Sequence, residues 1–135
     1  MMQSFTVYGQ PVAKGRPRLG ANGHTYTPEK TREAEHMIQR CASLAHLKPM
    51  HDPVVVEINF YFSIPKSWSK RAKEEARLMH VLPAHKPDID NCIKLVLDAL
   101  NKLAWDDDTQ VVGVVARKYY ADVPRTFICI EEVTP

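Results

Sequence analysis

Alternating apolar and polar residues in the first half of the chain predict a strand, a helix and a second strand. Residues 5–9 alternate with a period of two and end in Gly-Gln-Pro, which is typical of a short strand. Residues 34–45 instead repeat apolar side chains every three or four positions, which predicts a helix that packs on a sheet. Residues 53–62 are rich in β-branched and aromatic side chains and alternate from Val56, so we expect a central strand.

The ends of this first helix are marked by residues with helix-terminal preferences. Thr27 is expected to cap the helix, because a proline and an acid follow it at the first two helical positions. The helix should end near residues 46–47, since Pro49 lies just beyond. The preceding residues 12–26 are rich in glycine, proline and basic side chains, and we expect a loop.

The second half of the chain predicts one weak helix, one strong helix and two strands. Residues 69–79 are good helix formers with few apolar anchors, so this short helix should be exposed. Residues 93–100 place apolar side chains at i, i+3, i+4 and i+7, which predicts a helix with one buried face. Strand-like runs at 110–120 and 125–133 close the chain, and residues 121–124 between them predict a hairpin.

This order of elements predicts an α+β fold. The order β-α-β-(α)-α-β-β is most simply met by a two-layer domain in which helices pack on one face of a mixed β-sheet. A chain of 135 residues with 44% apolar and 25% charged residues has enough material for one core and too little for two catalytic domains. We therefore expect residues 1–135 to form a single soluble domain.

Cysteine usage and the lengths of the apolar runs indicate the compartment. Cys41, Cys92 and Cys129 are widely spaced and odd in number, so we expect reduced, buried thiols rather than disulfides or zinc ligands. No apolar run approaches the roughly 20 residues that span a bilayer, and the first residues lack the features of a signal peptide. These observations predict a cytoplasmic protein without a membrane partner.

Charge is distributed unevenly along the chain. The formal net charge is only +2, but residues 1–50 hold seven basic and three acidic residues, whereas residues 86–135 hold six basic and nine acidic ones. Lys14, Arg16 and Arg18 in the predicted loop are candidate contacts for nucleic-acid phosphates, and a solvated basic loop is the alternative. The acidic part of the chain suggests carboxylates that hold a cation.

A set of carboxylates surrounds the predicted third helix. Asp88 and Asp90 flank its start, and Lys94 lies one turn beyond Asp90 on the same face. The turn at residues 102–109 adds three consecutive aspartates, 106–108, and all five carboxylates converge if this turn folds back over the helix start. Clustered carboxylates repel one another unless a hard cation neutralises them, and Mg²⁺ held in this way suits phosphodiester hydrolysis.

Each member of this set also has a purely structural explanation. Asp88 after proline is a good N-cap, and the helix dipole favours Asp90 in the first turn by about 0.3–1 kcal/mol. Residues 106–108 resemble an ordinary solvated turn, and Asp90 with Lys94 resembles a surface ion pair. Spacing alone therefore leaves both explanations open.

The combination resembles a known family, the RusA-family Holliday junction resolvases. The resemblance is carried, in order and spacing, by Lys-Pro-Asp-Ile-Asp-Asn at 86–91, Lys94, Asp-Ala-Leu-Asn at 98–101 and Trp-Asp-Asp-Asp-Thr-Gln-Val at 105–111. Upstream, the basic segment 9–18 followed by Tyr-Thr-Pro at 26–28 is similar to a loop in phage- and prophage-type members. The similarity covers nearly the whole chain.

The resemblance implies roles for individual residues. Asp88, Asp90 and Asp108 match the family's essential metal-binding acids, Lys94 matches its catalytic lysine, and Asp107 matches an accompanying metal-binding acid. The family's cofactor is Mg²⁺, which Mn²⁺ replaces. Its members nick four-way junction DNA symmetrically in the cytoplasm of bacterial or phage-infected cells.

Partner predictions follow from the same match. Lys14, Arg16, Arg18 and Lys86 are the predicted DNA contacts, and family members are homodimers. Symmetry agrees with dimers, because a four-way junction needs two nicks on opposed strands while one chain offers one carboxylate site. Two copies about a two-fold axis would supply both nicks.

Two other functional classes are a restriction-type nuclease and a DNA-junction-binding protein that does not cleave. A restriction-type nuclease needs an Asp/Glu-x-Lys tripeptide, and no lysine in the chain has an acid two positions earlier. The chain also lacks the GxxxxGK and GxSxG patterns of P-loop and serine-elbow enzymes. A DNA-junction-binding protein that does not cleave remains the alternative.

Overall fold

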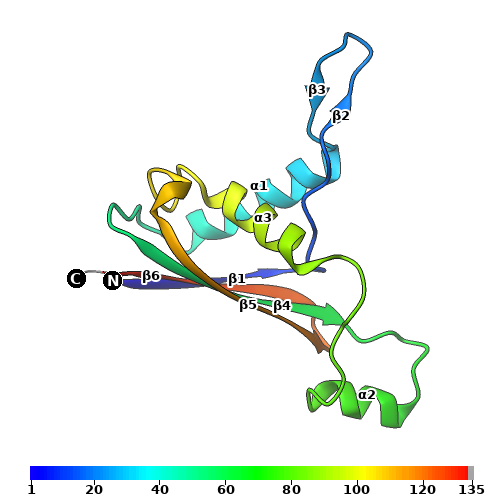
Figure 1. Ribbon diagram of the computed structural model, residues 1–135. Coiled ribbons are helices and arrows are strands. Elements are labelled where there is room, and N and C mark those ends of the chain that lie inside the picture. Colours follow the sequence, from blue (N-terminus) through cyan, green and yellow to red (C-terminus); the bar gives the residue numbers. More distant parts are fainter. Residues whose placement is uncertain (134–135) are drawn as a thin grey trace.

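A four-stranded mixed sheet carries the fold, as Figure 1 shows for the computed structural model, which describes residues 1–133 except for the side chain of Arg18. The strand order is β1 (Met2–Tyr8), β6 (Arg125–Glu132), β4 (Val54–Ser63) and β5 (Val111–Ala121). β6 is antiparallel to both of its neighbours, whereas β4 and β5 are parallel. β5 therefore forms one edge of the sheet.

Two of the helices cover one face of this sheet (Figure 1). These are α1 (Glu29–Leu44) and α3 (Ile89–Leu100), which also pack on each other. The short helix α2 (Lys70–Arg77) lies on the other side of the sheet in the figure, near the end of β5. The α+β class and the mixed sheet are confirmed, while α2 departs from the expected single helical face. Within residues 1–133, no helix is both long enough and apolar enough to cross a membrane.

The core lies between β4 and the two covering helices. The side chains of Val54, Val56, Ile58 and Phe60 alternate inward along β4 and are at most 1% exposed. Burial of such a side chain contributes about 1.5–3 kcal/mol. Because both long edges of β4 are hydrogen-bonded to neighbours, this strand is central, as its apolar alternation predicts.

The expected hairpin between the last two strands is wrong. Residues 122–124 do connect β5 to β6, but β4 lies between them, and β5 pairs with β4 in parallel. A short connection with turn residues does not itself decide which strands are neighbours. The apolar strand β4 is stabilised by partners on both of its edges, and it therefore separates the two.

Two boundaries near the first helix also differ from expectation. The segment 12–26 contains a small hairpin, β2 (Arg18–Leu19) with β3 (Thr25–Tyr26), that projects from the body in Figure 1. Pro28 rather than Thr27 occupies the N-cap of α1, with φ −54° and ψ 143°. A proline there cannot cap through its side chain, and α1 begins without a side-chain capping hydrogen bond.

Candidate functional site

Asp88 and Asp90 lie at the start of α3, as predicted. Asp88 occupies the N-cap position with φ −68° and ψ 143°, but its side chain makes no capping hydrogen bond. Asp90 stands in the first turn, and both residues are exposed. The capping explanation for Asp88 thus holds for its backbone only, and its carboxylate is left for other partners.

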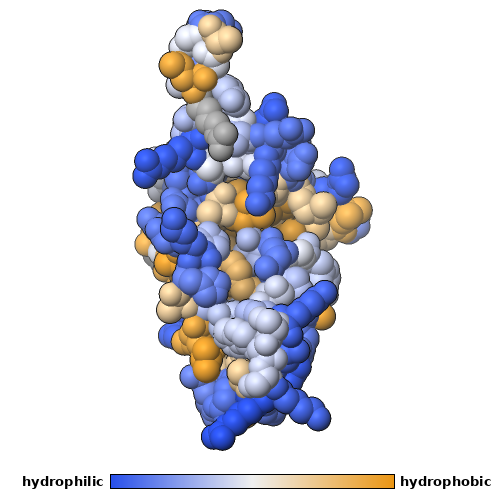
Figure 2. Space-filling model, turned by 90° about the vertical axis from the view of Figure 1, so that its right-hand side faces the viewer, coloured by the Kyte–Doolittle hydropathy of each residue, from blue (hydrophilic) through white to orange (hydrophobic). Residues whose placement is uncertain are grey.

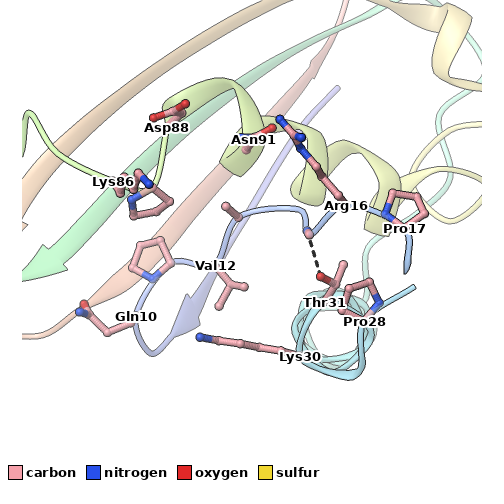
Figure 3. A pocket seen from close by; sticks show the side chains of 14 residues that line it. Gln10, Val12, Arg16, Pro17, Pro28, Lys30, Thr31, Lys86, Asp88 and Asn91 are labelled. Atoms are coloured by element: carbon pink, nitrogen blue, oxygen red, sulfur yellow. Dashed lines mark hydrogen bonds between the residues drawn. The ribbon is translucent and has the colours of Figure 1, made fainter. Parts of the chain in front are cut away.

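A groove of about 810 Å³ joins this helix start to the basic loop. Figure 3 shows Lys86 and Asp88 on one side of it and Arg16 with Lys30 on the other. Asn91 also lines the groove, from the first turn of α3. The surrounding face of the molecule is mostly hydrophilic, with some apolar side chains exposed near its middle (Figure 2). Three cations and one predicted metal-binding carboxylate therefore share a single concave surface.

The basic loop contacts α1 closely at Gly15. Its backbone N–H donates a hydrogen bond of 3.0 Å to Oγ1 of the buried Thr31, drawn as the dashed line in Figure 3. A Cβ atom at position 15 would lie only 2.8 Å from that oxygen, so glycine permits the close approach. This contact holds the neighbouring Arg16 at the groove.

Lys14 has a structural role that sequence reasoning missed. Its ammonium lies 2.8 Å from Glu35 of α1 and 3.2 Å from Asp98 of α3, with only 19% of its side chain exposed. Although partial burial lowers the pKa of Lys14, these two carboxylates outweigh it and raise the pKa above its usual value. This ammonium therefore bridges two helices, and its predicted contact with DNA phosphate stays a prediction.

The remaining predicted cations are placed differently from Lys14. Arg16 and Lys86 line the groove, as a DNA contact requires. Arg18 lies in β2, where its backbone pairs with Tyr26 of the projecting hairpin. Lys94 is exposed on α3 and approaches Asp98 at 3.7 Å rather than Asp90. The assigned roles of these residues stay predictions.

The acidic turn lies at the opposite end of α3 from Asp88 and Asp90. The helix has 12 residues and so spans about 18 Å. The following turn contains the 3₁₀ helix η1 (Asp108–Gln110) and leads directly into β5. Within residues 1–133, no three His, Cys, Asp or Glu side chains lie close enough together to hold a metal ion. The expected convergence of five carboxylates is therefore wrong within one chain.

Each acid of this turn has a local partner. Asp106 lies 2.9 Å from Nδ1 of His51, and Asp108 accepts a hydrogen bond of 2.9 Å from the indole N–H of Trp105. Asp107 caps η1, and hydrogen bonds from Thr109 and then Lys102 lower its pKa to about 2. These contacts order the turn at the C-terminal end of α3, and the length of that helix separates it from Asp88 and Asp90.

Several groove and support residues escaped sequence reasoning. Lys30 lines the groove from the first turn of α1, and its position directly after the basic loop was a usable signal. Lys118 and Tyr120 of β5 contact the segment that precedes Asp88. No local pattern reveals these two contacts, because they join residues more than 30 positions apart.

Two comparisons with known proteins agree with this geometry. The family model described as Endodeoxyribonuclease RusA matches residues 8–131, which include the groove, both α3 acids and the acidic turn. The chain is also 40% identical over 136 residues to the Bacillus subtilis (strain 168) protein named "Uncharacterized protein YqaN", with 96% of each chain covered. A family match over nearly the whole length, together with an acid beside basic residues in one groove, leads to one conclusion: the chain belongs to the RusA family of endodeoxyribonucleases.

Proposed function

We propose that this protein is a Mg²⁺-dependent endonuclease that resolves four-way DNA junctions by paired nicks, and that it works as a homodimer. The observation that carries the proposal is the groove that Arg16, Lys30 and Lys86 line together with Asp88. Cations attract the phosphate backbone of DNA, whereas a bare carboxylate repels it. A divalent cation that binds both the carboxylate and the phosphate would offset this repulsion, which explains a carboxylate among phosphate-binding cations.

The donor set at the start of α3 fits Mg²⁺. Asp88 and Asp90 offer hard carboxylate oxygens two residues apart, and Asp88 makes no capping bond that would compete. Mg²⁺ usually binds one or two carboxylates and keeps its other positions for water and substrate phosphate oxygens. When bound, the ion lowers the pKa of a water molecule and offsets charge on the phosphate. Asp88 and Asp90 are the residues that would hold it.

The side chains around these acids would bind and orient the DNA. Arg16 and Lys86 stand on opposite sides of the groove and can contact phosphates on either side of the scissile bond. Lys30 adds a third cation at the groove's edge. Lys94, whose side chain is 63% exposed one turn beyond Asp90, would offset negative charge near the cleaved bond.

A second copy of the chain would bring the two separated acidic groups together. β5 runs from the acidic turn to the contacts beneath Asp88, and it is an edge strand with Val112 and Val115 63% and 53% exposed. Exposed apolar edges readily pair with another chain. Antiparallel pairing of two β5 strands would set each acidic turn beside the partner's α3 start, and two complete sites would result.

The test compares a synthetic mobile four-way junction with a linear duplex of the same sequence, each incubated with the protein and Mg²⁺. We expect paired nicks in opposed strands of the junction, and loss of nicking when EDTA replaces the metal. Binding without nicks would favour the non-cleaving junction binder. Equal cutting of both DNAs would favour a nuclease without structural selectivity.

Two variants that remove the same charge test whether the nicking reaction depends on Asp90 of α3. Asp90→Asn removes one negative charge with little change in shape and should abolish nicking while junction binding persists. Glu33→Gln makes the same charge change at an exposed position of α1 and should leave nicking unaltered. Full nicking by Asp90→Asn would remove Asp90 from the mechanism.

A further inference from the structure

Lys118 breaks the apolar pattern of the strand that carries it. It is paired with Phe60 across β4 and β5 and lies on the sheet face that the helices cover, whereas its neighbour Arg117 points to the opposite face. A lysine at such a position costs stability unless its ammonium finds partners. Departures of this kind concentrate at functional sites.

The ammonium of Lys118 is bound to the segment that leads into Asp88. Its Nζ donates hydrogen bonds of 2.6 Å to the carbonyl oxygen of His85 and 2.9 Å to that of Pro87. The same nitrogen lies 5.4 Å from the ring centroid of Phe62, within the range of a cation–π contact. Residues 85 and 87 are thus held by one side chain of β5.

Tyr120, two residues further along β5 on the same face, contacts the same segment through the side chain of His85. The ring of His85 places Nδ1 2.7 Å from the carbonyl oxygen of Lys86 and Nε2 2.9 Å from the hydroxyl of Tyr120. A carbonyl oxygen only accepts, so Nδ1 carries a proton, and in the neutral ring Nε2 then accepts from the tyrosine hydroxyl. Tyr120 is itself packed edge-on against Trp68, with ring centroids 5.1 Å apart.

These contacts satisfy three consecutive carbonyl groups, those of residues 85, 86 and 87. The segment belongs to no strand or helix, and Pro87 has no backbone N–H to anchor it. Asp88 is the next residue, and Lys86 itself lines the groove. The side chains of β5 therefore determine where the first acid and one cation of the groove stand.

We propose that Lys118 is a positioning residue, which fixes Asp88 and Lys86 by binding the carbonyl oxygens of His85 and Pro87. The proposal rests on the proposed function, because it assigns Lys118 to the cleavage reaction through Asp88. Lys118 is not among the residues that line the groove in the described part of the chain, so we expect it to act through Asp88 and Lys86 rather than by contacting the DNA. Displacement of a reacting group by about 1 Å costs roughly 100-fold in rate.

The test uses Lys118→Met, which keeps the length of the side chain and removes its donors, with Arg117→Met as the matched control. We expect Lys118→Met to speed amide hydrogen exchange at residues 88–92 and to lower kcat for junction nicking by about 10- to 100-fold, with KM unchanged. Lys118→Arg restores donors and should recover most of kcat. Arg117→Met should match the wild type in both measurements.

Each result decides the proposal. Unchanged exchange at residues 88–92 in Lys118→Met would overturn the anchoring role, and faster exchange with an unchanged kcat would overturn the positioning role. A rise in KM with a normal kcat would make Lys118 a DNA contact instead. If the wild-type chain does not nick junctions, the proposed function fails, and hydrogen exchange still decides the anchoring.

A second variant covers the case in which Lys118→Met does not fold. Tyr120→Phe removes only the hydroxyl that binds His85, and the packing of the ring on Trp68 is kept. Tyr120→Phe should lower kcat by a smaller factor than Lys118→Met does, and it should also speed amide hydrogen exchange at residues 88–92. A Tyr120→Phe variant that equals the wild type in both measurements would contradict the anchoring of this segment by β5.

Discussion

Replacing Lys14 by methionine tests whether this lysine stabilises the fold or binds DNA. The sequence places Lys14 with Arg16 in one basic loop, but in the structure its partly buried ammonium lies between Glu35 and Asp98. Methionine keeps most of the length and apolar volume of the side chain and removes its charge. If Lys14 bridges the two helices, its replacement should lower stability and leave DNA binding unchanged. If Lys14 binds DNA phosphate, its replacement should weaken DNA binding and leave stability unchanged.

The expected loss of stability follows from the two ion pairs. A hydrogen bond to a charged group contributes about 1.5–3 kcal/mol. The side chains of Lys14, Glu35 and Asp98 remain 17–27% exposed, so solvent screening places the loss near the low end, at about 2 kcal/mol. With an unfolding entropy of about 2.1 cal/mol/K per residue, that loss lowers Tm by roughly 7 °C for 135 residues.

The pH dependence of this contribution has a definite sign. The paired carboxylates raise the pKa of Lys14 above its usual 10.5, despite the opposing effect of partial burial. A raised pKa contributes stability that is complete below the unfolded-state value and is lost as the pH rises through the folded-state value. The stability difference between wild type and Lys14→Met should therefore persist at neutral pH and shrink above pH 10.5.

Two assays test Lys14, and each has a matched control. Urea unfolding measures stability, with Lys48→Met as the control because Lys48 is exposed. Fluorescence anisotropy of a labelled junction measures affinity between about 50 and 200 mM salt. Lys14→Met should keep the wild-type salt slope, whereas Arg16→Met should keep stability and reduce that slope by about 0.9, the value for one phosphate contact. Wild-type stability with a reduced salt slope in Lys14→Met would refute the bridging role.

The remaining predictions concern the acids and the loop contact. Hydrogen bonds lower the pKa of Asp107 to about 2, so the stability lost in Asp107→Asn should be complete above pH 4 and vanish near pH 2 in acid-unfolding curves. Equimolar Asp88→Asn and Asp108→Asn, each inactive alone, should regain single-strand nicks on mixing if acids are shared between copies; no recovery would exclude shared sites. Gly15→Ala should weaken junction binding in the anisotropy assay, because its Cβ would lie 2.8 Å from Thr31 Oγ1, and wild-type affinity would contradict that clash.

Local patterns in the sequence determined the elements and the identity of the candidate acids. The β-branched and aromatic run at residues 53–62, which alternates from Val56, predicted β4, and the stripe at 93–100 predicted α3. Such patterns succeed because a strand or helix buries one face at a fixed period, whatever its neighbours are. The motif at 86–91 likewise identified the start of α3, since the residues of the motif are adjacent in the chain.

Tertiary structure alone decided which distant groups meet. It inserted β4 between β5 and β6, placed the carboxylates of Glu35 and Asp98 on Lys14, and anchored residues 85–87 to Lys118. It also separated the acidic turn from Asp88 by the length of α3. Contacts of this kind depend on how elements far apart in the chain pack against one another, and the local period of apolar residues carries no information about that packing.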